Sequence, residues 1–502
     1  MSKQAPRPSL PQKRPVAAGA SHSSNWTRSR AVPINLRRRR SESATDQVAH
    51  FIAGLRAKAL SNAVKEAAKE HLLDGFATML GGAAQDASRR IDIYLRIFPS
   101  RPESTVIGSN RKLNAQYAAL ANGIRGHVLD YDDAQLATFP SRPYGQLTHP
   151  TTPVLAAGLA LAEKIKATGL ELLIAYIAGV EVACRLADAI HPNHYLKGFH
   201  PTGTIGAFGA TAACAHLLKL DPTRIRWALG IAGSLASGVR AHRGTMAKSL
   251  NAGHAAENGI VAASLAQTGF TASDNIFDDA MGYFAAAGSG PVDRKLIKFG
   301  APYFLVRPGI AIKIYPCAGV LHPALDAIID LAKEHDLRAS DVKRIRVRLG
   351  PDAALPLVYN RPTTALEGKF SLPFSAAIAL VYRRAGLDEY KDANVLNSKI
   401  TAVMKRVDLR RDAALQSAGN LGCQAEVEIE LDSGRTYRKR ATVAKGHPKK
   451  PLTREELREK FLQCAGERIA GERAKKFIED LWSIEKVAAL APWLRLLRPV
   501  RR

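Results

Sequence analysis

Three acidic residues fall within four positions of this sequence, at Asp130, Asp132 and Asp133. Neighbouring carboxylates repel one another. Burying them together can therefore raise the pKa of one of them and create an acid or base that works near neutral pH. A solvated helix end or a hydrogen-bonded loop has the same composition. The cluster alone therefore does not decide between a catalytic and a structural role, and the structural role is favoured until other residues support catalysis.

Two histidines stand in the same local setting, each followed by proline and threonine at the start of a predicted helix. They are His149 and His200. A helix N-terminus attracts anions, so a histidine there can bind an anionic substrate or exchange a proton with it. A structural role is the alternative for either histidine alone, and the repeated setting favours function.

Lys248 lies within a stretch rich in glycine and alanine that runs from Gly198 to Phe270. Small residues at this density suit helices whose backbones approach closely, and an unpaired ammonium is costly in such apolar surroundings. Lys248 therefore needs an anionic partner, either a substrate carboxylate or a protein carboxylate such as Glu257 or Asp130. With the two histidines, it predicts the floor of an enzyme pocket for a small polyanion.

A fourth polar group follows in the sequence K-I-Y-P-C-A-G-V-L-H-P, which contains Lys313, Tyr315 and His322. The lysine and the histidine can both contact an anion. Ordinary core packing explains Tyr315 equally well.

These groups must be positioned by helices, which the spacing of apolar residues predicts. The spacing begins near Val48 and continues, broken by short turns, to about Leu265; one predicted helix over 113–129 leads into the acidic cluster. From Pro451 onward the pattern is again helical. Thr453 is the expected cap there, with a glutamate three residues later.

After about Asp293 the helical spacing gives way to segments in which apolar and charged residues alternate. Residues 343–349 and 426–431 alternate apolar with charged side chains, which predicts half-exposed strands. A turn over 432–434 leads into a further strand over 435–443 and so predicts a hairpin. Two helices, over 323–334 and 373–384, are expected to cover the sheet.

The predicted fold is mainly α with an α+β part: a large all-helical domain formed by the N- and C-terminal parts of the chain, and a smaller inserted α+β domain. The expected segments are a disordered basic tail (1–45), the N-terminal part of the helical domain (46–292), the α+β domain (293–446) and the returning C-terminal helices (447–502).

The 502-residue chain has a formal net charge of +27, which first suggests an anionic partner such as nucleic acid. Residues 1–45 hold ten lysine or arginine residues and one acidic residue, so a large share of the excess lies in this tail. Zinc-finger, RRM and KH signatures do not occur in the sequence, and aromatic residues make up only 6%. Nucleic-acid binding is therefore the less favoured alternative, although the tail can contact polyanions.

The five cysteines are scattered without a C-x-x-C pair, which argues against a disulfide framework and against a metal site. The sequence has no run of about 20 uncharged apolar residues, so we expect no membrane span. The expected compartment is the cytoplasm, or the mitochondrion if the arginine-rich tail is a presequence.

The chain resembles the MmgE/PrpD family, which includes 2-methylcitrate dehydratase and cis-aconitate decarboxylase. The resemblance covers roughly residues 46–490. It rests on motifs in the same order: L-L-D-G-F-A-T-M-L-G-G (72–82), N-G-I-R-G-H-V-L-D-Y-D-D (122–133), T-H-P-T (148–151), G-F-H-P-T-G-T (198–204), M-A-K-S-L-N-A-G-H-A-A-E-N-G (246–259), K-I-Y-P-C (313–317), H-P-A-L-D-A (322–327) and K-F-S-L-P-F (369–374). It implies that the α+β domain is a lid, that the protein is a homodimer, and that catalysis needs neither a metal ion nor an organic cofactor.

The resemblance also implies roles for individual residues. The family's aspartate matches Asp130, its pocket histidines match His149 and His200, and its lysines match Lys248 and Lys313. The expected catalytic residues are Asp130, His149, His200 and Lys248, and the expected substrate-binding residues are Lys313, Tyr315, His322 and Asp133.

Two features depart from the family pattern. Members commonly continue the aspartate motif as D-D-T-H, whereas residues 132–135 here read D-D-A-Q, so Ala134 lacks a hydroxyl. The segment over 130–149 is also longer than in decarboxylase-like members and contains Arg142 and Tyr144. Both changes bear on the choice of substrate.

These observations predict a metal-independent lyase of the dehydratase type that acts on a small di- or tricarboxylic acid by acid–base catalysis. Asp130 or one histidine serves as the base, the other histidine serves as the acid, and the lysines hold carboxylates. The alternatives are a lyase like cis-aconitate decarboxylase, a binder of nucleic acid or of an anionic surface, and a family member that has lost activity.

Overall fold

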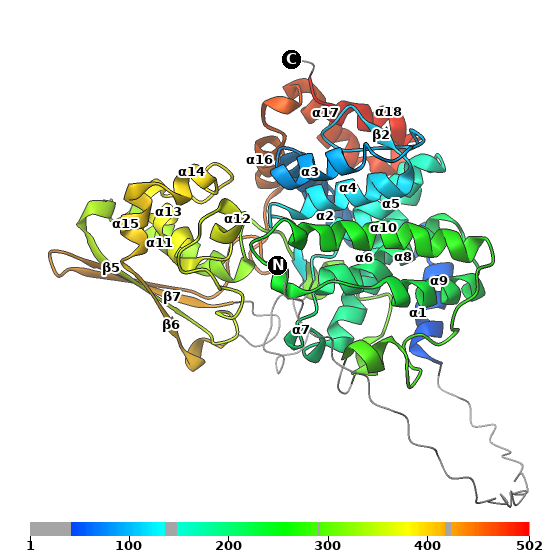
Figure 1. Cartoon of the computed structure of the whole chain (residues 1–502), viewed down its shortest axis with the longest axis horizontal. Helices are drawn as coiled ribbons and strands as arrows, with labels where there is room; N and C mark the ends of the chain where they lie inside the picture. The colour runs from blue at the N-terminus through cyan, green and yellow to red at the C-terminus, as the bar shows by residue number, and fades with distance from the viewer. Residues whose placement is uncertain (1–41, 136–147, 289–291, 417–422, 501–502) are drawn as a thin grey trace, which may run out of the picture. The chain divides into compact units, whose positions relative to one another are not determined.

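Helices dominate the computed structural model of the chain (Figure 1), which describes residues 42–135, 148–288, 292–416 and 423–500. Most of the predicted tail and the segment that holds Arg142 and Tyr144 lie outside these ranges. The first helix begins at Ala44, where Ser43 caps it by accepting a hydrogen bond from a backbone N–H.

Polar caps define where the N-terminal helices begin. Ser61 caps α2, while Thr168 and Glu171 form a reciprocal capping box at the start of α6. Pro201 occupies the first turn of α8, where its missing N–H costs nothing. The helices of this part are α1 (Ala44–Gly54), α2 (Asn62–Gly82), α3 (Asp86–Tyr94), α4 (Ala115–His127), α5 (Thr151–Lys164), α6 (Gly169–Ile190), α7 (Asn193–Leu196), α8 (Pro201–Leu217), α9 (Pro222–Leu235) and α10 (Ala247–Gln267).

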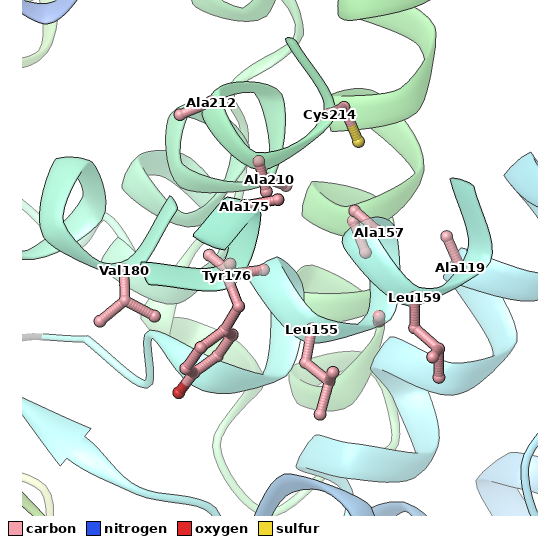
Figure 2. Packing of buried hydrophobic residues seen from close by; sticks show 14 of the residues in the cluster. Ala119, Leu155, Ala157, Leu159, Ala175, Tyr176, Val180, Ala210, Ala212 and Cys214 are labelled. Carbon is pink, nitrogen blue, oxygen red and sulfur yellow. The ribbon is translucent and has the colours of Figure 1, made fainter. Parts of the chain in front are cut away.

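Small and aliphatic side chains fill the space between these helices. Figure 2 shows Leu155 of α5 next to Tyr176 of α6, with Leu159 of α5 toward Ala119, Val180 of α6 beyond Tyr176, and Ala210 of α8 near Ala175. All of these residues are fully or almost fully buried. Each large side chain of this kind contributes about 1.5–3 kcal/mol through its burial.

Helices α4 and α10 approach so closely that glycine is required on both. A Cβ atom on Gly123 would lie 2.6 Å from the Cα of Gly253, and one on Gly253 would lie 2.6 Å from the backbone oxygen of Leu120. Both distances are far below a normal contact. The expectation of close backbone approach from the glycine- and alanine-rich stretch is therefore confirmed at this crossing.

The α+β part contains a four-stranded sheet in the order β6-β5-β7-β8. Its strands β5 (Val342–Leu349), β7 (Ala425–Leu431) and β8 (Thr436–Ala441) agree with the predicted ones, and β7 and β8 form the predicted hairpin. The fourth strand, β6 (Val407–Arg411), pairs in parallel with β5 and was not predicted. The alternating residues Ile345 and Val347 are buried beneath helices.

Helices cover one face of this sheet (Figure 1). Its apolar residues form a second hydrophobic core with α11 and α13, separate from the core of the N-terminal helices. The helices of this part are α11 (His322–Glu334), α12 (Ala365–Gly368), α13 (Leu372–Tyr382), α14 (Asp392–Val395) and α15 (Ser398–Met404).

The last helices pack against the first ones. They are α16 (Arg454–Ala465), α17 (Gly471–Trp482) and α18 (Leu490–Leu494). The predicted capping box of Thr453 and Glu456 is present at the start of α16. Phe76 of α2 contacts Phe477 and Trp493, with ring centroids 5.0 and 5.4 Å apart.

The predicted class, mainly α with an α+β part, is therefore confirmed. Residues Glu42–Arg502 form one compact unit, so the boundaries expected at 292 and 446 stay predictions. Among the helices in the described ranges, none has both the length and the apolar composition that a bilayer crossing requires.

Short two-residue strands complete the helical part. They are β1 (Ser104–Thr105), β2 (Lys112–Leu113), β3 (Ala134–Gln135) and β4 (Ile310–Ala311), which pair as β1–β2 and β3–β4. The β3–β4 pair matters for the site because it places the chain before Lys313 alongside the chain after Asp133.

Gly123→Ala tests the crossing of α4 and α10. The added methyl group meets backbone that cannot move aside, so the free energy of unfolding should fall by roughly 1–3 kcal/mol in urea denaturation. Gly54→Ala is the matched control, because a Cβ atom at Gly54 meets nothing within 4 Å. An equal loss of stability in both variants would contradict the close approach.

Candidate active site

The site begins where α4 ends and the chain turns into the acidic segment. Asp130 follows this helix with a φ of +52°, in the left-handed region that a residue with a side chain rarely adopts. Its buried carboxylate meets two ammonium groups, with Lys248 Nζ 2.8 Å from Oδ1 and Lys313 Nζ 3.3 Å from Oδ2. Lys313 also donates to the backbone oxygen of Asp130, at 3.0 Å.

The two lysines decide the charge of Asp130. Burial by itself would raise the pKa of this carboxyl, but Lys248 and Lys313 outweigh burial and hold the pKa well below its ordinary value of 3.8. The expectation that crowding of the acidic cluster raises a pKa is therefore wrong for Asp130, because cations and not carboxylates surround it. The group is ionised at neutral pH in this structure.

Lys248 projects from the first turn of α10, and its protein partner is Asp130. The alternative partner, Glu257, is wrong: its carboxylate accepts a hydrogen bond from Gln116 of α4, at 2.8 Å. The ammonium of Lys248 also lies 2.7 Å from Nε2 of His127.

His127, the last residue of α4, is a site residue that sequence reasoning missed. Its Nε2 faces the Lys248 ammonium, which can only donate, so Nε2 must accept. The proton therefore lies on Nδ1 and is donated to Asp132 Oδ2, at 2.7 Å. The ring of His127 lies 4.8 Å from that of His149 and 5.5 Å from that of His200. Its position near the end of the predicted helix over 113–129, three residues before Asp130, was the available signal.

His149 stands just before α5, as predicted. Its Nδ1 lies 2.7 Å from the backbone oxygen of Asp133, which can only accept, so the neutral ring carries its proton on Nδ1 and leaves Nε2 as an acceptor. Burial, helped by Lys313, lowers the pKa of His149 to about 3, against the opposing effect of Asp132. The imidazole is therefore neutral near pH 7.

His200 precedes the first turn of α8 and shows the opposite tautomer. The side-chain amide of Asn251 donates to its Nδ1 at 3.1 Å, so the neutral ring carries its proton on Nε2. Burial and the nearby Lys248 hold the pKa of His200 well below its ordinary value. The two predicted histidines thus present one acceptor and one donor.

Asp133 and Tyr315 both have protein partners in this structure, and their expected contact with substrate stays a prediction. Asp133 accepts hydrogen bonds from the backbone N–H and the hydroxyl of Thr151, and it pairs with His71 at 2.9 Å. Tyr315 donates its hydroxyl to Asp326, at 2.7 Å. Neither side chain joins the groups that converge on Asp130.

His322, the remaining predicted contact, lines a small cavity together with Lys313 and Ala134. Burial and Lys313 lower the pKa of His322 to about 3, so the ring is neutral. Gln135, which replaces the common histidine of the family motif, donates its amide to the backbone oxygen of Cys184, at 2.8 Å.

One group within the described residues has the spacing of a metal site: His127, Asp132 and His149 offer ligand atoms within 4.8 Å of one another. However, Asp132 Oδ2 already accepts hydrogen bonds from His127 and Thr152. The Lys248 ammonium beside the His127 ring also repels a divalent cation. This arrangement favours acid–base chemistry, and the expectation of a metal-free site stays a prediction.

Comparisons with known proteins agree with the motifs. The model of the MmgE/PrpD N-terminal domain matches residues 46–295, and that of the MmgE/PrpD C-terminal domain matches residues 315–484. The chain is 29% identical over 473 residues to the cis-aconitate decarboxylase of Homo sapiens, covering 90% of this chain and 95% of that protein. It is 27% identical over 478 residues to the cis-aconitate decarboxylase of Aspergillus terreus, covering 91% and 96%.

The names of these relatives agree with the expectation of an enzyme of the lyase class. The two domain models together span most of the sequence outside the basic tail, which is the range expected from the motifs. The resemblance is therefore confirmed, and this chain belongs to the MmgE/PrpD family.

Proposed function

We propose that the protein is a lyase that acts on a small tricarboxylic acid, with cis-aconitate as the leading candidate substrate and decarboxylation as the leading reaction. The observation that carries this proposal is the convergence of Lys248 and Lys313 on one buried carboxylate, next to three imidazoles. The names of the relatives support the same substrate.

In this proposal the substrate binds because its carboxylate competes with Asp130 for the ammonium groups of Lys248 and Lys313. A carboxylate of the substrate can take the place that Asp130 holds beside Lys248, forming a short charge-assisted hydrogen bond. The three imidazoles are neutral at pH 7, so they add no repulsion when an anion arrives. His149, whose Nε2 is an acceptor, can also gain a proton when the negative charge of the substrate raises its pKa.

Decarboxylation places its demand on these same cations. When the bond between carbon and a departing carboxylate breaks, CO2 leaves and the electron pair stays behind, spread over the double bond and an adjoining carboxylate. Fixed ammonium groups beside that carboxylate stabilise the developing charge because they need no reorganisation. A proton must then reach carbon.

His149 is the proposed proton donor. Its Nδ1 proton is already held by the backbone oxygen of Asp133, and its Nε2 can take up a proton once substrate charge offsets that of Lys313. The resulting imidazolium lies close to Asp132, whose nearest carboxylate oxygen is 3.6 Å from Nδ1. His200, with its proton on Nε2, is the proposed hydrogen-bond donor to the substrate.

Dehydration of a hydroxy-tricarboxylate is the second candidate, and the opposite tautomers of the two histidines favour it. Neutral His149 offers Nε2 as a base for the carbon-bound proton, and His200 offers an N–H to the departing hydroxide. The same two lysines would hold the carboxylates. The reaction that was first expected from the sequence thus remains a proposal beside decarboxylation.

An assay with cis-aconitate, citrate and 2-methylcitrate separates the two candidates. We expect cis-aconitate to be consumed with release of one CO2 per molecule, measured by a coupled carbonate assay. Formation of a new double bond from either hydroxy acid, without CO2, would favour dehydration instead. Turnover of none of the three acids would refute the proposed function.

The same assay tests the metal-free mechanism. Because the hydrogen bonds of His127 and Asp132 already form the site, exhaustive treatment with EDTA should leave turnover unchanged. Activity that is lost on chelation and restored by one added metal ion would assign a metal to the group of His127, Asp132 and His149.

Proton uptake tests the assignment of His149. Its pKa lies far below 6.5 in this structure, and an anionic ligand should raise it, so binding near pH 6.5 should take up protons and affinity should rise as the pH falls. Calorimetry in two buffers of different ionisation enthalpy measures the uptake. His149→Gln should reduce it, whereas His254→Gln, at a half-exposed histidine of α10, should not. Proton release on binding would contradict the assignment.

Lys248→Met tests the role of the first lysine. Turnover should fall by the equivalent of about 1.5–3 kcal/mol for a lost charged hydrogen bond. The variant should also lose less stability than the about 3–5 kcal/mol typical of a broken buried pair, because Lys313 still neutralises Asp130. Urea denaturation and steady-state kinetics measure the two effects.

Glu257→Gln is the control for this variant. Glutamine at position 257 can still accept the hydrogen bond from Gln116, so stability and turnover should both stay close to those of the parent protein. Normal turnover per folded molecule in Lys248→Met would exclude Lys248 from catalysis.

A further inference from the structure

Lys460 of α16 reaches the two segments that carry Asp130 and Lys313, although it lies far from both in the sequence. Its ammonium donates to the backbone oxygen of Tyr131 at 2.9 Å and to that of Lys313 at 2.7 Å. It also pairs with Asp74 of α2, at 2.5 Å. Lys460 therefore makes two hydrogen bonds to backbone oxygens of the site segments and one ion pair with α2. Lys460 is 5% exposed.

The two segments that Lys460 joins already contact each other. Tyr131 donates its hydroxyl to the backbone oxygen of Ile314, at 3.2 Å, and Lys313 donates to the backbone oxygen of Asp130. Just beyond, β3 pairs with β4. Lys460 therefore fixes carbonyl groups within one residue of Asp130 and at Lys313 itself, without touching the reacting groups.

We infer that Lys460 is a positioning residue of the lyase reaction: it holds the backbone of Tyr131 and Lys313 so that Asp130 and the Lys313 ammonium keep their relative geometry. The kinetic part of this inference rests on the proposed function. Catalysis depends steeply on such geometry, since a displacement of about 1 Å can cost about 100-fold in rate.

A purely structural role is the competing explanation, in which Lys460 only neutralises the buried carboxylate of Asp74. Lys69 of α2 provides a matched comparison. It is also 5% exposed, and its ammonium contacts Glu66, Glu485 and the backbone oxygen of Trp482, each at 2.9 Å. These contacts include no segment of the candidate site.

The experiment compares Lys460→Met, Lys460→Arg and Lys69→Met in the full chain. Melting temperature measures stability, and kcat and KM for cis-aconitate are determined per folded molecule. Both methionine variants should melt earlier than the parent protein. Only Lys460→Met should lose kcat, by about 10- to 100-fold, and Lys460→Arg should recover part of it because arginine keeps the charge and several donors.

Equal kcat values for Lys460→Met and Lys69→Met, both within twofold of the parent protein, would overturn the inference. If Lys460→Met does not fold, the double variant Lys460→Met with Asp74→Asn replaces it, because removing both charges leaves no unpaired buried ion. The double variant must show the same loss of kcat; normal kcat there refutes positioning.

Failure of the proposed function is distinguishable from failure of this inference. A parent protein that turns over none of the three acids refutes the function, and hydrogen exchange then decides the role of Lys460. Faster exchange confined to the peptides around Tyr131 and Lys313 in Lys460→Met, and absent from Lys69→Met, supports positioning. Uniform or unchanged exchange overturns it.

Discussion

The candidate site depends on one interaction, in which the buried carboxylate of Asp130 pairs with the ammonium groups of Lys248 and Lys313. Without Asp130, the buried Lys313 ammonium and the partly buried Lys248 ammonium would lose the carboxylate that they share, which is costly in such surroundings. The three residues come from the end of α4, the start of α10 and the chain after β4. The close crossing of α4 and α10 at Gly123 and Gly253 brings two of these segments together.

A second set of polar contacts surrounds the ion pairs of Asp130 and holds the segments that carry them. His71 and Asp74, one turn apart on α2, hold Asp133 and Lys460 respectively. Thr151 completes the contacts of Asp133 at the start of α5. Each carboxylate of the acidic segment thus has its own role. Asp130 pairs with the lysines, Asp132 orients His127, and Asp133 connects the segment to α2 and α5.

The sequence was sufficient to predict features that depend on residues close to one another in the chain. Apolar spacing located the long helices, and alternation located β5 and β7. The turn after β7 located β8, and the Thr453 capping box located the start of α16. The strand β6 escaped because its residues V-D-L-R-R alternate too briefly to stand out. Five residues of the predicted site lie together in the structure: Asp130, His149, His200, Lys248 and Lys313. They could be predicted because each of them stands in a motif that resembles the family's.

Contacts between distant segments could not be predicted in the same way. The sequence permitted either Glu257 or Asp130 as the partner of Lys248, and only the packing of α4 against α10 decides between them. Asp133 and Tyr315 are acidic or polar residues in matching motifs, yet Thr151 and Asp326 occupy their hydrogen-bonding groups. The tautomers of the histidines depend on single backbone or amide contacts that no pattern encodes.

The position of Lys460 on α16 has a consequence for the order of folding during synthesis. Helices α1 to α10 leave the ribosome well before α16, so Asp74 and the carbonyl groups of Tyr131 and Lys313 must wait for their cation. A nascent chain that ends before Lys460 lacks the helix that packs on α2, so Asp74 and the carbonyl groups of Tyr131 and Lys313 have no contact with this cation. The contacts of Lys460 can therefore form only after the last segment of the helical part has been synthesised, so this support of the site is the last part of it to be completed.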